Sequence, residues 1–149
     1  MRFLTEKIRH LKIGWNEREL TETDFYRLCR RFKIKVVEMP LRTGGFYYRV
    51  MGRDFIAVDS RLPREKKLLV LFHELGHFLF HTPESGATAN FHGVGRRTRV
   101  EREADVFALC ALIPKLWIET KTLQELVDQD GFTPEIVAER LAVLERYGI

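Results

Sequence analysis

The stretch Leu71–His81 reads LFHELGHFLFH and lies in the most apolar part of the chain. The surrounding segment Arg64–Phe80 is almost continuously apolar, which is typical of a helix at the centre of a fold. Within it, three histidines follow one another at intervals of four, and Glu74 directly follows the first. Polar side chains in a buried helix need partners, because burying them without hydrogen bonds costs free energy. The stretch therefore predicts a central helix that carries a functional site.

The first part of this stretch, His73-Glu74-Leu75-Gly76-His77, has the pattern HExxH. Residues i and i+4 of a helix lie one turn apart on the same face, so both imidazoles can bind one Zn²⁺. Glu74 lies about 100° around the helix from His73, where it can take a proton from a zinc-bound water. The alternative is a solvated glutamate between two surface histidines, which the apolar neighbours disfavour. The pattern predicts zinc as cofactor, His73 and His77 as ligands and Glu74 as general base.

His81 is the nearest candidate for the third protein ligand that a catalytic zinc site needs. However, three ligands at positions i, i+4 and i+8 of a straight helix are spread over roughly 12 Å. Bonds of about 2.1 Å to one zinc ion cannot span that length. We expect His81 to be structural or to support the ligands from the helix end, where a cation is favoured.

A second apolar helix is predicted at Val100–Ile113, and it offers a better third ligand. Glu101 and Asp105 share one face of it, and three alanines would allow it to pack tightly against the HExxH helix. We expect Glu101 to bind the metal, and Asp105 to accept a hydrogen bond from the far ring nitrogen of one of the two histidine ligands. Glu103 lies about 200° around the helix from Glu101. It is interpreted as an acidic residue that the helix dipole favours in the first turn.

The rest of the chain predicts an α+β fold, a mainly helical single domain (residues 1–149) whose small antiparallel sheet packs against the HExxH helix. Thr82–Arg99 is rich in Gly, Ser, Thr and Asn and is interpreted as a loop over the cleft. The remaining predicted elements are a helix at Thr21–Phe32, strands at Lys33–Met39, Phe46–Met51 and Phe55–Val58 (the last two as a hairpin), and helices at Pro114–Glu119, Leu123–Asp130 and Thr133–Tyr147.

Composition restricts the class of protein. Of the 149 residues, 45% are hydrophobic and 31% are charged, which suits one soluble domain with a real core. No apolar run is long enough to span a bilayer, and the N-terminus lacks the apolar segment of a secretory signal. Cys29 and Cys110 each lie in an apolar helical pattern, which favours reduced, buried thiols. We expect a cytoplasmic protein with no membrane partner.

The two motifs together resemble one known family. HELGHFLFH followed by EREADVFALCALIP is similar to the ImmA/IrrE-type zinc metallopeptidases, whose pattern is HELGHxxLH and then ExEA[ND]xFAxxLLxP. Phe80 stands in place of Leu, and the CALIP end departs from LLxP, but the departures are conservative. The resemblance covers about Phe55 to Pro114. It implies a zincin-like, gluzincin-like fold and proteolysis, often of a helix-turn-helix repressor or antitoxin-like partner encoded beside the peptidase.

Peptide hydrolysis also needs a donor that stabilises the oxyanion. Candidates are His92, Tyr47, Tyr48 and Tyr147, and the sequence does not choose between them.

Two other functions remain open. The first is a non-enzymatic binding module on the same fold, against which the intact Glu74 argues. The second is a basic nucleic-acid-associated protein that would bind through Arg96, Arg97 and Arg99, since the net charge is +4. No nucleic-acid-binding motif is present, so direct nucleic-acid binding is not expected.

Overall fold

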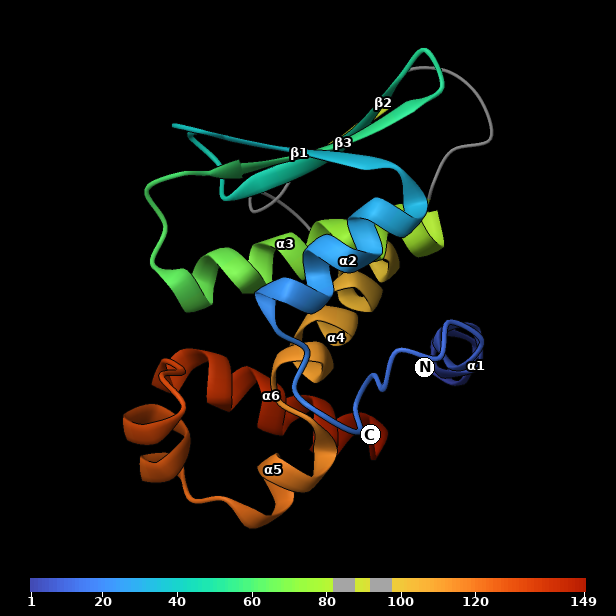
Figure 1. Cartoon of the computed structure of the whole chain (residues 1–149). Coiled ribbons are helices and arrows are strands. Elements are labelled where there is room, and N and C mark those ends of the chain that lie inside the picture. Colours follow the sequence, from blue (N-terminus) through green and yellow to red (C-terminus); the bar gives the residue numbers. More distant parts are fainter. Residues whose placement is uncertain (82–87, 92–97) are drawn as a thin grey trace. The chain divides into compact units, whose positions relative to one another are not determined.

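The computed structural model describes residues 1–81, 88–91 and 98–149 of the chain (Figure 1). The chain divides into two compact units. One consists of Met1–Leu20 together with Leu109–Ile149, and the other of Thr21–Ala108. The HExxH motif, Glu101 and Asp105 all lie in the second unit.

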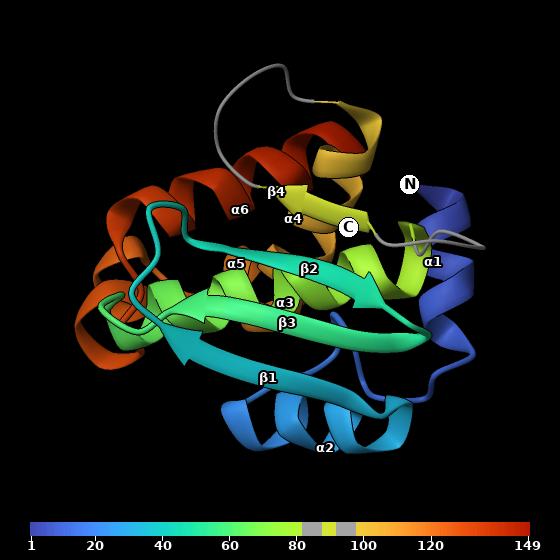
Figure 2. The ribbon, with the colours of Figure 1, turned by 90° about the horizontal axis from the view of Figure 1, so that it is seen from above.

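The second unit contains a four-stranded sheet in the order β1-β3-β2-β4 (Figure 2). The strands are β1 (Ile34–Met39), β2 (Gly45–Val50), β3 (Arg53–Asp59) and β4 (Thr88–Phe91). β2 and β3 form the predicted antiparallel hairpin, and β4 adds to β2 antiparallel. β1 pairs parallel to β3, so the sheet is mixed, and the prediction of an antiparallel sheet is wrong for β1. The reason is that the chain reverses twice between β1 and β3, which returns β3 to the direction of β1.

The β2–β3 hairpin turns on two residues. Met51 and Gly52 have φ angles of 52° and 74°, and Val50 is paired with Arg53 across the turn. Two central residues with positive φ are the mark of a type I′ turn, whose twist matches that of the flanking strands. The turn therefore fixes the register of the hairpin.

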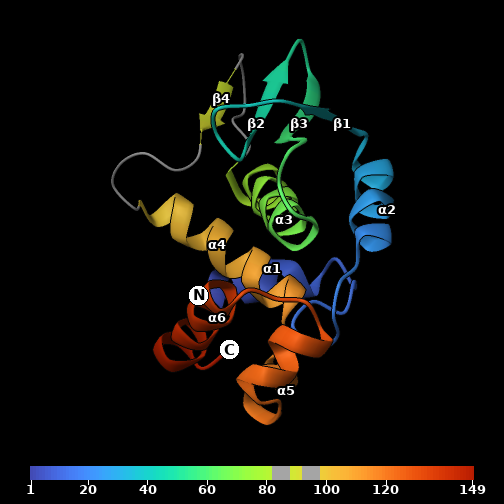
Figure 3. The ribbon, with the colours of Figure 1, turned by 90° about the vertical axis from the view of Figure 1, so that its left-hand side faces the viewer.

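Two helices cover one face of this sheet (Figures 1 and 3). The first is α2 (Glu22–Phe32), which begins at a capping box between Thr21 and Asp24 as the sequence predicts. The second is α3 (Arg64–His81), the predicted HExxH helix. α3 packs against β2, where the rings of Tyr47 and Phe78 lie 6.0 Å apart. The next helix, α4 (Arg99–Leu112), crosses α3 on the side away from the sheet (Figure 3).

The predicted loop Thr82–Arg99 is only partly described. Residues 88–91 form β4 instead, and Arg99 already belongs to α4, so the loop prediction is wrong at these positions. β4 is short and has few β-branched residues, which is why its sequence reads as a loop. Residues 82–87 and 92–97 lie outside the described residues, together with the proposed cover of the cleft.

The first unit is wholly helical where it is described. Its elements are α1 (Arg2–Arg9), α5 (Lys115–Thr120), the π-helical turn η1 (Glu125–Gln129) and α6 (Pro134–Tyr147). α6 begins at Thr133, whose side chain accepts from the Ile136 amide, and ends at Gly148 with φ 71°, as expected from the sequence. α1 is an element that the sequence reading did not predict.

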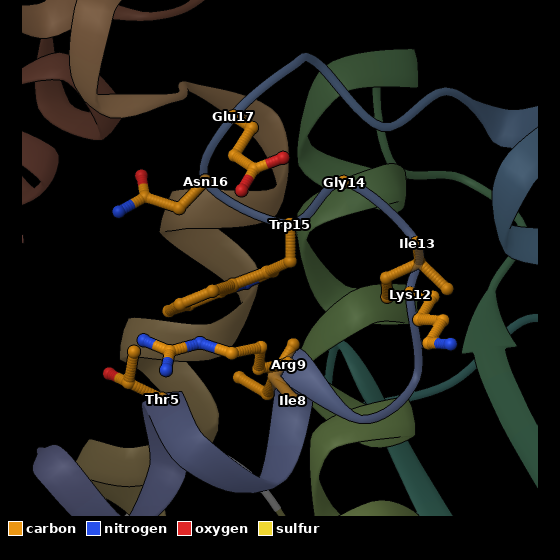
Figure 4. Close-up of a pocket in the computed structure, with 9 residues that line it drawn as sticks. All are labelled: Thr5, Ile8, Arg9, Lys12, Ile13, Gly14, Trp15, Asn16 and Glu17. Carbon is orange, nitrogen blue, oxygen red and sulfur yellow. The ribbon is translucent and has the colours of Figure 1, made fainter.

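A cavity of about 390 Å³ lies in the first unit (Figure 4). The indole of Trp15 lies over the Arg9 side chain at its centre (Figure 4). Its lining consists of Thr5, Ile8, Arg9 and residues 12–17. None of these belongs to the predicted site.

Within the described part of the chain, no helix is both long enough and apolar enough to cross a membrane.

Candidate metal centre

α3 presents the polar side chains of the HExxH motif in the interior. His73 is 6% exposed, and Glu74 and His77 are both 0% exposed. The same helix buries Phe72 and Leu75 completely, so its apolar residues supply the burial that holds the polar ones in place. The site is therefore built into a central helix, as the sequence predicts.

Gly76 allows α4 to approach α3 closely. A Cβ at this position would lie 3.2 Å from Cδ1 of Phe107 and 3.3 Å from Cα of Ala104. Ala104 and Phe107 are both fully buried, so neither has open space to move into. This contact, between a glycine and a small residue of the next helix, brings the first turn of α4 to the histidines.

Replacing Gly76 with alanine is expected to force the two helices apart. We expect a loss of about 1–3 kcal/mol in the free energy of unfolding, as for other overpacked cores. Zinc affinity should fall as well, because Glu101 is carried on the displaced helix. Urea unfolding and zinc titration of Gly76→Ala measure both effects, with Lys66→Ala on the exposed face of α3 as control. Unchanged stability in Gly76→Ala would show that the helices tolerate the added methyl group.

Three ligand atoms converge between α3 and α4. The Nε2 atoms of His73 and His77 are 3.1 Å apart. One carboxylate oxygen of Glu101 lies 3.1 Å from His73 Nε2, and the other lies 3.1 Å from His77 Nε2. Among the described residues, these three form the group that could hold a metal ion. Sequence spacing alone indicated Glu101, and the structure brings it to the histidine pair.

The donor set fits a tetrahedral zinc ion. Two ligands with bonds of about 2.1 Å at tetrahedral angles lie about 3.4 Å apart, close to the spacing between the ring nitrogens. Two nitrogens and a carboxylate oxygen are ordinary zinc ligands, and three protein ligands leave a fourth position for water or substrate.

Asp105 holds His73 from the side away from the metal position. Its Oδ1 lies 2.7 Å from His73 Nδ1. The Nδ1–H group donates a hydrogen bond to this carboxylate, which leaves Nε2 directed towards Glu101. Burial opposes a charge on His73, but hydrogen bonds to Asp105 and Glu101 outweigh it and raise the pKa of His73 to about 9. The sequence left open which histidine Asp105 contacts, and the structure places it on His73.

The second histidine has the opposite electrostatic character. Burial and the neighbouring charge of His73 lower the pKa of His77 to about 4. The carboxylates beside His73 favour its charged form, whereas His77 favours the neutral form in which a ring nitrogen can bind a metal, so metal binding to both would release a proton from His73.

Glu74 lies beside the ligands. Burial raises the pKa of its carboxyl well above the ordinary value, and the charge of His73 and the backbone amide of Tyr47 act in the opposite direction. A carboxylate that is fully buried next to a candidate metal position is placed to exchange a proton with a water bound there.

His81 and Glu103 form a second contact between the two helices. Nδ1 of His81 lies 3.1 Å from Nδ1 of His77, and its Nε2 lies 2.9 Å from Oε2 of Glu103. The other oxygen of Glu103 accepts from Nε of Arg99 at 2.7 Å. Burial opposes ionisation of Glu103, but these hydrogen bonds lower its pKa below the ordinary value. Glu103 is 8% exposed and has two side-chain partners, His81 and Arg99, neither of which the helix-dipole interpretation predicted.

The candidate oxyanion donors are placed as follows. The Tyr47 hydroxyl donates to Asp54 at 2.6 Å. Tyr48 stacks on Phe55 with ring centroids 4.9 Å apart. Because successive side chains alternate across a strand, Tyr48 faces away from α3, towards which Tyr47 points. Neither contact supports an oxyanion role, and for both tyrosines that role stays a prediction. Tyr147 belongs to the first unit, and His92 lies outside the described residues.

Comparison with known proteins gives the family. The Peptidase_M78 family, described as the IrrE N-terminal-like domain, matches residues 29–145. The chain belongs to the Peptidase_M78 family. Neither the curated proteins nor the solved structures contain a significant match to it. Membership confirms the resemblance seen in the motifs and gives the chain a function of the metallopeptidase type.

The motifs that carry the resemblance contain a signal for the contact between His81 and Glu103, which the sequence did not predict; it predicted only that His81 supports the ligands. The pattern HELGHxxLH fixes a third histidine, at the position of His81, and ExEA fixes a second glutamate, at the position of Glu103. Neither residue is needed as a ligand in the His73–His77–Glu101 group.

Proposed function

We propose that this chain is a zinc peptidase that cleaves a partner transcriptional repressor of the helix-turn-helix type. His73, His77 and Glu101 hold the zinc ion, and Glu74 is the general base. The convergence of these three ligand atoms beside the buried Glu74 carboxylate carries the proposal. When bound, zinc polarises the scissile carbonyl and makes a water molecule more acidic.

The side chains of the site then have separate tasks. Glu74 takes a proton from the attacking water and delivers it to the nitrogen of the leaving amine. Asp105 keeps the Nδ1 proton on His73, so that Nε2 remains directed at the site. The packing of α3 against α4 buries the two histidines, whereas the Glu101 side chain is 25% exposed, so solvent or substrate can approach from the Glu101 side.

Metal content tests the first part of this proposal. We expect about one zinc per chain in the purified or reconstituted wild type, and loss of zinc in Glu101→Gln, which removes the anionic ligand. Glu65→Gln, an acidic residue at the start of α3, is the matched control and should keep its zinc. A wild type that binds no zinc after reconstitution, or a Glu101→Gln variant that binds it normally, would contradict the site.

The substrate is inferred from the resemblance to ImmA/IrrE-type peptidases. Incubation of the zinc-loaded chain with the helix-turn-helix protein encoded beside it, followed by intact-mass spectrometry, should reveal two fragments from one cleavage. Chelation of the zinc should stop the reaction. An intact repressor in the presence of a fully loaded chain would remove this class of substrate and leave the peptidase without one.

A further inference from the structure

His77 has its own chain of hydrogen bonds, separate from that of His73. It runs from His77 Nδ1 to His81 Nδ1 at 3.1 Å, and from His81 Nε2 to Glu103 at 2.9 Å. Arg99 completes it with a contact of 2.7 Å to the same carboxylate. This series of hydrogen bonds links the end of α3 to the start of α4, beyond the three candidate ligands.

The positions of the protons along this chain follow from one requirement. If Nε2 of His77 binds a metal, the remaining proton of its ring is on Nδ1. Nδ1 of His77 then donates, so Nδ1 of His81 has to accept. A neutral His81 that accepts at Nδ1 carries its proton on Nε2, and that proton is donated to Glu103. Glu103 is an acceptor at both oxygens, from His81 and from Arg99.

Because most of these side chains are buried, losing one of their hydrogen bonds should cost free energy. The side chains of His81 and Glu103 are each 11% exposed, whereas that of Arg99 is 76% exposed. His77 is 0% exposed. A proton on the Nδ1 of a buried ligand costs free energy if its acceptor is removed, because water does not replace the acceptor readily. Among these hydrogen-bonded groups, Arg99 is the exposed one, so water can replace its hydrogen bond to Glu103.

We propose that His81 and Glu103 are positioning residues that fix the tautomer and orientation of His77, as Asp105 does for His73. This inference rests on the proposed function, since it assigns a supporting role around the same zinc site. Each histidine ligand is thereby held by a carboxylate of α4: His73 directly by Asp105, and His77 through His81 by Glu103.

Zinc affinity, measured by competition with a chelator, tests the proposal without any substrate. Removal of the outer partners of a metal ligand weakens metal binding about 10- to 100-fold. We expect losses of this size in His81→Phe, which fills the space without an acceptor, and in Asp105→Asn as reference. His81→Asn keeps an acceptor near the position of Nδ1 and should recover part of the affinity. The zinc affinity of Glu103→Gln should lie between those of His81→Phe and His81→Asn. The zinc affinity of Arg99→Ala should stay within about twofold of wild type.

A second readout separates positioning from a merely structural contact. Long-range ¹H–¹⁵N spectra of the zinc-loaded wild type should show His81 protonated at Nε2 and unprotonated at Nδ1. The opposite tautomer would overturn the proposal. So would variants of His81 and Glu103 that melt at lower temperature without zinc but bind zinc with wild-type affinity.

The outcomes are distinguishable from failure of the proposed function. Wild-type zinc binding with unchanged affinity in His81→Phe, His81→Asn and Glu103→Gln would overturn this inference alone. Absence of zinc binding in the wild type would overturn the site and the inference together. If His81→Phe does not fold, the Asn and Gln variants and the tautomer of wild-type His81 still decide.

Discussion

Glu74→Gln is expected to hydrolyse the repressor about 100- to 10,000-fold more slowly than the wild type, which is the usual contribution of a general acid–base residue. Glutamine has nearly the same shape as glutamate, so the fully buried site keeps its packing. It cannot take a proton from water at any pH near neutrality. Glu74 is not one of the three candidate ligands, so zinc should remain bound. Cleavage rates from fragment masses and zinc content of the same sample measure both.

The stability of Glu74→Gln provides an independent check of this role. Burial raises the pKa of the Glu74 carboxyl, which means that the folded protein disfavours its charged form. A neutral amide avoids that cost, so the metal-free variant should be at least as stable as the wild type in urea. Residues that are placed for catalysis rather than for stability behave in this way. A variant that cleaves at the wild-type rate would remove Glu74 from the mechanism, and one that loses zinc would assign it to the ligand set.

The HExxH helix could be predicted from the sequence because two patterns occur in the same segment. Apolar residues that continue around α3 require burial, and polar residues at i and i+4 require a common partner. Glu101 and Asp105 could be predicted for a similar reason, since a spacing of four keeps both on the face of α4 that the alanines and Gly76 allow to approach. In each case the information is local to one helix or to a contact between small residues.

Glu103 could not be placed in this way. Sequence gives the angle of a residue around its helix but not the tilt of that helix over its neighbour. In the structure Glu101 contacts His73 and His77, whereas Glu103 contacts His81 further along α3. Both flanks of the first turn of α4 therefore reach the histidine row. The same limit applies to β4, whose pairing with β2 depends on a contact between segments far apart in the sequence.

Arg140→Leu is expected to lower the free energy of unfolding by about 3–5 kcal/mol, because it removes several hydrogen bonds from a charged donor, each worth about 1.5–3 kcal/mol. Arg140 lies on α6 in the first unit and is 0% exposed. Its Nε donates to the Ile113 carbonyl at 2.6 Å, Nη1 to the Ile149 oxygen at 2.9 Å and Nη2 to Asn16 Oδ1 at 3.0 Å. Leucine fills part of the space but donates none of these hydrogen bonds, and an acceptor left unpaired in the interior costs about 1–3 kcal/mol. Asn16 Oδ1 keeps its second donor, the Lys115 backbone amide at 2.9 Å, so the main loss is at the Ile113 carbonyl.

The experiment can be confined to the unit that contains Arg140. Both tryptophans of the chain, Trp15 and Trp117, belong to the first unit, so their fluorescence in a urea titration reports unfolding there. Arg146→Leu, exposed on the same helix, is the matched control and should change stability by no more than about 0.5 kcal/mol. Arg140→Lys should recover little, because one ammonium group cannot reproduce the planar fork of the guanidinium. Equal midpoints for Arg140→Leu and Arg146→Leu would mean that water replaces the guanidinium at no cost, which full burial of the side chain argues against.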